Sequence, residues 1–190
     1  YDFNEFLLYS SQIAKKLKKP VILDPVGVGA TKLRTEISNK LVCYSDVIKG
    51  NASEIIALSK NINKTKGVDS FHDTEQAEDS AKNLAIKTNS IIVVSGKKDL
   101  VIDKNKNFFI NFGHNLMSYV TGMGCVLSSV ISAFCSVNKN YLQATLNAVS
   151  YFTLCGKLAS KKTNLPGSFR TFFLDELFKA DFDGMKDLLC

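Results

Sequence analysis

Apolar positions recur along the chain with two different periods, and their alternation predicts an α/β protein. A helical period predicts helices over residues 3–17, 33–44, 74–87, 122–137, 141–160 and 169–180. Short apolar runs rich in β-branched residues predict buried parallel strands at residues 21–23, 46–49 and 91–94. Two further runs, at 100–103 and 108–112, flank the polar segment K-N-K-N and predict a hairpin that adds antiparallel strands to one side of the sheet.

One more helix is predicted to start at Asn51, which is followed three residues later by Glu54. An asparagine at a helix N-cap accepts an amide hydrogen bond, and a glutamate three residues on can return one, which makes a capping box. The spacing leaves open whether Glu54 only closes this cap or also faces a cation. The segment 61–70 is polar and contains glycine, so it is predicted to be a surface loop.

The stretch V-T-G-M-G-C at residues 120–125 runs directly into an apolar helical pattern. The first amides of a helix have no partner within it, and they carry the partial positive charge of the helix dipole. Gly122 and Gly124 would let a ligand approach this backbone closely, so the stretch is a candidate phosphate site. The alternative is a loop-to-helix junction with glycines for packing, and this stretch alone does not decide between the two.

Polar residues follow two predicted strands, at the edge where parallel sheets bind ligands. Asp24 follows the run 21–23, and Ser95 and Gly96 follow the run 91–94. Ligands of open α/β sheets lie beyond the carboxyl ends of the strands, so Asp24 is a candidate for holding a metal ion or its waters. The alternative is an aspartate that bonds its own turn backbone. His114 lies in a loop, and we assign it no chemistry.

Composition narrows the class of ligand. The 190 residues are 45% hydrophobic, enough for one sizeable core, and the formal net charge is +6. The lysines are scattered, which fits a phosphate-bearing small molecule better than nucleic acid. No apolar run is long enough to cross a bilayer, so no membrane partner is expected. The five cysteines form neither a CxxC pair nor a metal-ligand spacing, which favours reduced thiols and a cytoplasmic location.

Five motifs together resemble those of the hydroxyethylthiazole kinases, the thiamine-salvage enzymes of the ribokinase-like superfamily. They are V-I-L-D-P-V-G-V-G-A-T at 21–31, K-G-N-A-S-E at 49–54, V-V-S-G at 93–96, G-H-N-L-M at 113–117 and V-T-G-M-G-C at 120–125. Their order and spacing fit along nearly the whole chain. The resemblance implies a single ribokinase-like kinase domain over residues 1–190, with a three-layer α/β/α fold and a mostly parallel central sheet that carries an antiparallel hairpin at one side.

The same resemblance implies an activity and a set of site residues. The reaction would be ATP-dependent phosphorylation of the primary hydroxyl of 4-methyl-5-(2-hydroxyethyl)thiazole, with Mg²⁺, in a homotrimer whose active sites lie between subunits. Carried over by position, the ATP-binding residues are Lys49, Ser95, Gly122 and Gly124, and Gly122 also contacts the thiazole substrate. The metal-binding residues are Asp24 and Glu54, and Cys125 is the catalytic residue beside the reacting hydroxyl.

The chain departs from the family pattern in three places. Lys49 stands where arginine is usual, and lysine lacks the planar fork with which arginine grips phosphate oxygens. Asn115 replaces the usual proline. The family's first strands and much of its thiazole pocket would precede Tyr1, so the chain is expected to lack the N-terminal portion of the family domain.

Two alternatives to this function remain. One is a related ribokinase-like vitamin kinase that acts on hydroxymethylpyrimidine or pyridoxal, and Cys125 together with the motif D-P-V-G-V-G-A-T argues against it. The other is a noncatalytic nucleotide-binding relative, for which Lys49 and the missing start of the domain are the motives.

Overall fold

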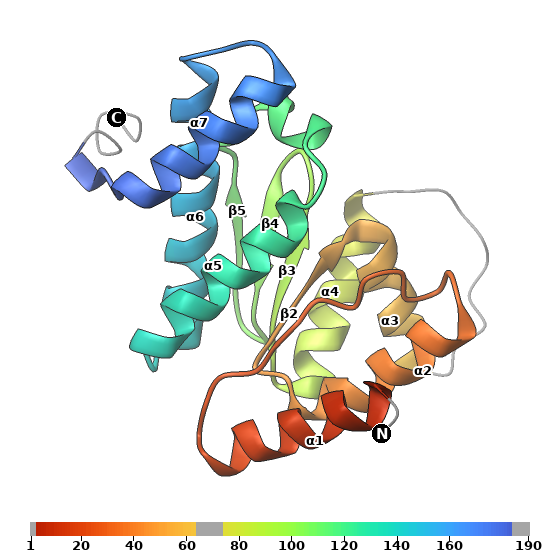
Figure 1. Cartoon of the computed structure of the whole chain (residues 1–190). Coiled ribbons are helices and arrows are strands. Elements are labelled where there is room, and N and C mark those ends of the chain that lie inside the picture. The colour runs from red at the N-terminus through yellow and green to blue at the C-terminus, as the bar shows by residue number, and fades with distance from the viewer. Residues whose placement is uncertain (1–2, 64–73, 184–190) are drawn as a thin grey trace.

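A five-stranded mixed sheet lies between two layers of helices in the computed structural model, which describes residues 3–63 and 74–183 (Figure 1). The strands, in their order across the sheet, are β1 (Ile22–Leu23), β2 (Val47–Asn51), β3 (Ile91–Ser95), β4 (Asp99–Ile102) and β5 (Asn107–Ile110). The first three strands run parallel, whereas β4 is antiparallel to β3 and β5 is antiparallel to β4. The predicted α/β/α fold with a hairpin at one side of the sheet is confirmed.

Helices from the first half of the chain cover one face of the sheet. They are α1 (Phe3–Lys16), α2 (Lys32–Leu41), α3 (Ala52–Asn63) and α4 (Thr74–Thr88), with the short 3₁₀ helix η1 (Val42–Tyr44) after α2. Ile55 and Leu58 of α3 and Leu84 of α4 are buried in the core on this side. These apolar contacts hold α3 and α4 against the parallel strands.

Two expectations for this half of the chain need correction. The helix predicted over 33–44 ends at Leu41 and tightens into η1. Its apolar pattern predicts that Leu33 and Leu41 are both buried, but Leu33 is 61% exposed and only Leu41 is buried. Helix α3 extends to Asn63, so the start of the loop predicted at 61–70 is helical. The remainder of that predicted loop lies outside the described residues.

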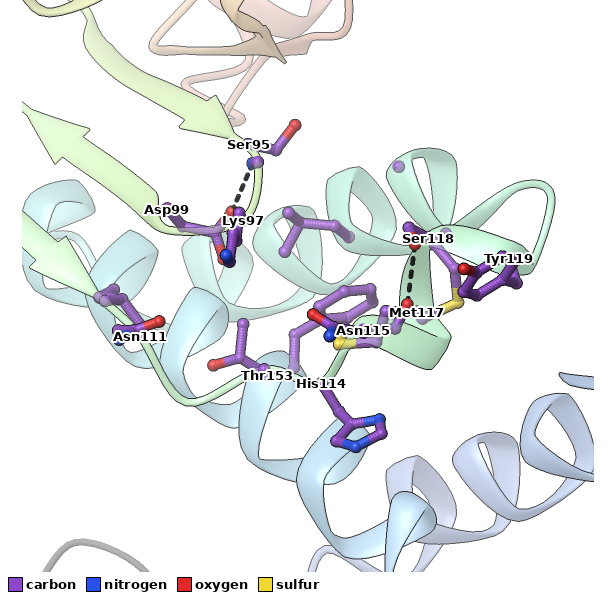
Figure 2. Close-up of a pocket in the computed structure, with 17 residues that line it drawn as sticks. Ser95, Lys97, Asp99, Asn111, His114, Asn115, Met117, Ser118, Tyr119 and Thr153 are labelled. Atoms are coloured by element: carbon purple, nitrogen blue, oxygen red, sulfur yellow. Dashed lines mark hydrogen bonds between the residues drawn. The ribbon is translucent and has the colours of Figure 1, made fainter. Parts of the chain in front are cut away.

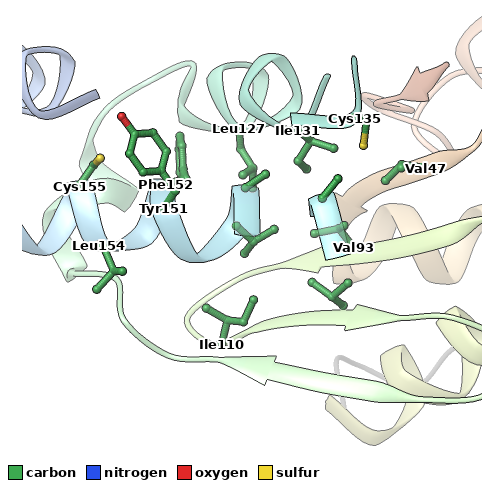
Figure 3. Close-up of a cluster of buried hydrophobic side chains, with 14 of the residues drawn as sticks. Val47, Val93, Ile110, Leu127, Ile131, Cys135, Tyr151, Phe152, Leu154 and Cys155 are labelled. Atoms are coloured by element: carbon green, nitrogen blue, oxygen red, sulfur yellow. The ribbon is translucent and has the colours of Figure 1, made fainter. Parts of the chain in front are cut away.

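Helices from the second half of the chain cover the other face. They are η2 (Asn115–Tyr119), α5 (Met123–Val137), α6 (Tyr141–Ser160) and α7 (Pro166–Lys179). Figure 3 shows Ile131 of α5 and Phe152 of α6 in one apolar cluster with Val93 of β3. Helix α7 begins at Pro166, earlier than predicted, because proline's fixed φ and missing amide suit the first turn of a helix. None of the described helices is long and apolar enough to cross a membrane.

The sheet separates two hydrophobic cores. Successive side chains of a strand point to opposite faces, so Val47 and Val93 pack against α5 and α6, whereas Ile48 and Ile92 pack against α3 and α4. All four side chains are fully buried. Strands buried on both faces favour apolar residues on both, which explains the apolar run at 91–94 in β3 and the pair Val47 and Ile48 in β2.

Asp99 is a charged residue buried at the start of β4. Its Oδ1 accepts a hydrogen bond from the amide of Gly96 at 3.0 Å, which closes the turn between β3 and β4. Burial raises the pKa of this carboxyl from 3.8 to about 6, although the Gly96 amide and the charge of Lys49 act in the opposite direction. The turn after β3 is therefore held by an acid that titrates near neutrality.

Phe173→Ala is expected to lower the free energy of unfolding by about 3–5 kcal/mol. Phe173 is 1% exposed, and its ring packs edge-on against Phe152 with 5.0 Å between centroids, so truncation leaves a cavity between α6 and α7. The neighbouring Leu174 is 48% exposed, and Leu174→Ala should cost less than about 1 kcal/mol. Denaturant unfolding measures both losses, and equal losses would contradict the packing described here.

The contribution of Asp99 to stability is expected to fall as the pH rises from about 4 to about 6, because Asp99 then ionises in a buried place. The native state keeps this proton at pH values where the unfolded chain has released it. Protonated Asp99 therefore favours the native state below about pH 4, and this contribution of about 3 kcal/mol is lost above about pH 6.

Asp99→Asn is the variant that tests this pH dependence, since its side-chain oxygen can still accept the Gly96 amide. In this variant the free energy of unfolding should not show the fall between about pH 4 and about pH 6 that Asp99 causes in the wild type. Free energies of unfolding of both proteins, measured at about pH 4 and about pH 8, give the comparison. A difference between variant and wild type that is the same at both pH values would refute the assignment.

Candidate functional site

A buried ion pair lies at the carboxyl ends of β1 and β2. The ammonium of Lys49, on β2, donates to Oδ2 of Asp24, the residue after β1, at 3.1 Å. The two side chains are 5% and 16% exposed, so both charges are largely removed from water. The parallel pairing of β1 and β2 brings the residues together, as expected for polar groups at this edge of the sheet.

Ser128 is a third member of this group and comes from α5. Its hydroxyl donates to the same Oδ2 of Asp24 at 2.8 Å and lies 3.2 Å from the carbonyl oxygen of Gly124. The other carboxylate oxygen, Oδ1 of Asp24, is buried and has no hydrogen-bond partner among residues 3–63 and 74–183. Two donors thus converge on one oxygen, while the second oxygen is unsatisfied.

The start of α5 lies against the Lys49 ammonium. Gly122 is the N-cap in the left-handed region, with φ of 92°, and no side chain caps the helix there. A Cβ at Gly124 would lie 2.9 Å from Nζ of Lys49, so only glycine lets the ammonium come this close to the backbone. Free helix amides beside a lysine form an anion-binding arrangement. The thiol of Cys125 is exposed in the same turn.

Glu54 ties the loop after β1 to α3. Its Oε2 accepts the amide of Asn51 at 2.9 Å, and Asn51 Oδ1 accepts the amide of Glu54 at 2.9 Å, which confirms the predicted capping box. Its Oε1 accepts the amide of Gly27 at 3.0 Å. Each carboxylate oxygen therefore already has one backbone partner, and a role of Glu54 toward a cation stays a prediction.

A pocket of about 640 Å³ opens next to this group (Figure 2). Ser95 and Asp99 lie at one end of it, whereas Met117 and Tyr119 of η2 lie at the other. Gly124 lines the pocket as well, which connects it to the start of α5 and to Lys49. The hydroxyl of Ser95 donates to the carbonyl of Gly50 at 3.3 Å, so β2 and β3 are joined at the pocket edge.

The structure brings together most of the predicted site residues. Lys49 and Asp24 are bonded to each other, and Gly124 of the stretch 120–125 contacts Lys49. Ser95 lines the same pocket as Gly124. Glu54 contacts the loop that follows Asp24 by accepting the amide of Gly27. His114 accepts the amide of Leu116 at 3.3 Å through Nδ1 and caps η2, which accords with a structural role.

Sequence reasoning missed three residues of the site. Ser128 lies four residues after Gly124, so helical spacing alone would have placed it on the same face of α5. Asp99 lies three residues after Gly96, a spacing typical of a side chain that closes its own turn. Met117 packs against Gly156 of α6, and no local pattern predicts a contact between residues so far apart.

The donor atoms suit a magnesium ion that is bound together with a nucleotide. No cluster of three or more His, Cys, Asp or Glu side chains fit for a metal occurs in the described part of the chain. Magnesium usually takes one or two carboxylates and completes its shell with phosphate oxygens and water. The unsatisfied Oδ1 of Asp24 fits this pattern.

Comparisons with known proteins agree on one family. The model described as "Hydroxyethylthiazole kinase family" matches residues 3–182. The hydroxyethylthiazole kinase of Chlamydia abortus is 44% identical over 176 residues, which is 92% of this chain and 67% of that protein. The hydroxyethylthiazole kinase structure from Pyrococcus horikoshii matches with a TM-score of 0.84 and 34% identity, over 93% of this chain and 66% of that one.

A more distant structure shows the fold alone. Ribokinase from Thermotoga maritima matches with a TM-score of 0.52 and 18% identity, over 86% of this chain and 52% of that chain. The present chain spans about two thirds of the length of the two hydroxyethylthiazole kinases. Because sequence and structure agree along almost the whole chain, it belongs to the hydroxyethylthiazole kinase family.

Proposed function

We propose that the protein containing this chain transfers the γ-phosphoryl group of ATP to the primary hydroxyl of hydroxyethylthiazole. The observation that supports this most strongly is that Lys49, Asp24 and the start of α5, which has no side-chain cap, lie together beside one pocket. Similarity to hydroxyethylthiazole kinases at 44% identity supports this alcohol over hydroxymethylpyrimidine or pyridoxal. Residues 1–190 would be the larger part of one ribokinase-like kinase domain.

The phosphates of ATP would bind at the start of α5. The amides that follow Gly122 have no side-chain cap, and the Lys49 ammonium lies next to Gly124, so positive charge is concentrated there. Ser95 lines the adjoining pocket and would contribute its hydroxyl to the nucleotide. Gly122 has open space at its Cα, which suits a backbone approached by both phosphate and substrate.

Asp24 would hold Mg²⁺ through its free Oδ1, and Glu54 would contribute through water. The ion would neutralise negative charge on the transferring phosphoryl group. The chain's own groups would do the positioning: Lys49 and the α5 amides hold the phosphate oxygens in place. A loose transition state for phosphoryl transfer demands this positioning more than it demands a strong base.

Cys125 would orient the reacting hydroxyl. Its sulfur is exposed in the first turn of α5, one residue from Gly124. In the thiolate form it would accept the hydroxyl proton, and so become a thiol, as the oxygen bonds to phosphorus. The bond between the γ-phosphorus and the leaving oxygen of ADP breaks in the same transfer.

The family resemblance supports a homotrimer with active sites between subunits and a cytoplasmic location.

The proposal is tested by offering the full-length protein hydroxyethylthiazole, hydroxymethylpyrimidine and pyridoxal in parallel, with ATP and Mg²⁺. Mass spectrometry of the products should reveal phosphate selectively on the thiazole alcohol. Phosphorylation of another alcohol instead would assign a different vitamin kinase. Nucleotide binding without any turnover would indicate a noncatalytic relative.

Cys125→Ala is expected to lower kcat by a smaller factor than Asp24→Ala, which should lower it by about 100-fold or more. The reason is that anchoring the charged phosphoryl group outweighs proton acceptance in a loose transition state. Cys43→Ala is the matched control, because Cys43 is also exposed but lies in η1, on the opposite layer. Steady-state kinetics give the three values, and an equal collapse in Cys125→Ala and Asp24→Ala would reverse the ranking.

A further inference from the structure

Ser128 makes a contact that the proposed function has not used. Its hydroxyl connects α5 to Asp24, a residue 104 positions earlier, at 2.8 Å. The same oxygen of Asp24 accepts the Lys49 ammonium at 3.1 Å. The carboxylate is therefore fixed from two sides through Oδ2, and its rotation is restricted.

These two bonds to Oδ2 also fix the position of the other carboxylate oxygen of Asp24, Oδ1. Oδ1 is buried and unpaired among the residues that the structure describes. A buried acceptor without a partner is costly, so such an oxygen marks a place where a cation or a donor binds later. If the carboxylate could rotate freely, its two oxygens would exchange and neither would be held ready.

We propose that Ser128 is a positioning residue that holds Asp24 so that Oδ1 faces the divalent cation carried by the nucleotide. This inference rests on the proposed function. Groups that hydrogen-bond to metal ligands typically change metal affinity by about 10- to 100-fold when they are removed. Ser128 stands in this relation to Asp24.

Ser128 is better suited to this task than Lys49. The lysine ammonium ends a flexible stem and is attracted by phosphate oxygens, so it can leave Asp24 when ATP binds. Ser128 has a short side chain on a regular helix and stays within reach of Oδ2. The hydroxyl thus remains the fixed partner of the carboxylate throughout ligand binding.

A purely structural role for Ser128 is the alternative, and α5 itself supplies the control. Ser132 is partly buried like Ser128, and its hydroxyl donates to the carbonyl of Ser128 at 2.8 Å, four residues earlier. Ser128 makes a comparable contact with the carbonyl of Gly124. The bond to Asp24 is what distinguishes Ser128, so the two alanine variants separate the two roles.

The test compares Ser128→Ala, Ser128→Thr and Ser132→Ala in the full-length protein. Mn²⁺ binding, measured by electron paramagnetic resonance with a non-hydrolysable ATP analogue and no thiazole, is the first readout. We expect Ser128→Ala to weaken Mn²⁺ binding about tenfold, Ser132→Ala to change it less than about twofold, and Ser128→Thr to restore it. In turnover, Ser128→Ala should raise the KM for Mg·ATP more than it lowers kcat.

Unchanged Mn²⁺ affinity in folded Ser128→Ala, or an equal loss in Ser132→Ala, would overturn the proposal. If Ser128→Ala does not fold, Ser128→Cys, which keeps the size of the side chain but donates weakly, carries the same expectation and the same refutation. Mn²⁺ binding is measured without the alcohol substrate. Failure to phosphorylate hydroxyethylthiazole with the expected Mn²⁺ pattern would therefore count against the proposed substrate and not against the role of Ser128.

Discussion

The buried pair of Lys49 and Asp24 is the interaction on which the site depends. It joins β2 to the end of β1, and Ser128 and Gly124 bring α5 against the same two side chains. Removing one partner of a buried ion pair typically costs about 3–5 kcal/mol, because the other charge is left without water or partner. The pair thus holds two strand ends and one helix start in fixed relative positions before any ligand arrives.

The same pair shapes how ligands can enter. In the proposed function a phosphate would compete with Asp24 for the Lys49 ammonium, and a cation would compete with Lys49 for the charge of the Asp24 carboxylate. In the proposed function each ligand therefore removes the competitor of the other, so that the binding of nucleotide and metal is mutually favourable. An arginine could bond carboxylate and phosphate through separate nitrogens, whereas the single ammonium of Lys49 has to be shared.

Most of the helices and strands could be predicted from the sequence, because its local signals agree with one another. Continuous apolar runs marked strands buried on two faces, and the capping box of Asn51 marked the start of α3. Periodicity was wrong at Leu33, because the spacing of Leu33 and Leu41 shows that they share a helix face but not which turns of that face reach the core. Much of the site was also predictable, since Asp24 follows β1 and Lys49 lies on the neighbouring parallel strand β2. The bond from Ser128 to Asp24 was not, because helical spacing gives the face of α5 on which Ser128 lies but not the residue 104 positions earlier that it meets.

The contact between Met117 and Gly156 determines how the far wall of the pocket behaves. A Cβ at Gly156 would lie 2.5 Å from the sulfur of Met117, so the missing side chain on α6 makes room for the thioether. One of the side chains that line that wall is consequently unbranched with three rotatable bonds, and methionine adapts readily to irregular shapes. A change of the Met117 rotamer would alter the width of the pocket at this wall and would require no shift of α6 or the sheet. Small differences in ligand bulk at this wall would then be met by a side-chain rotation, which costs less free energy than shifting a helix.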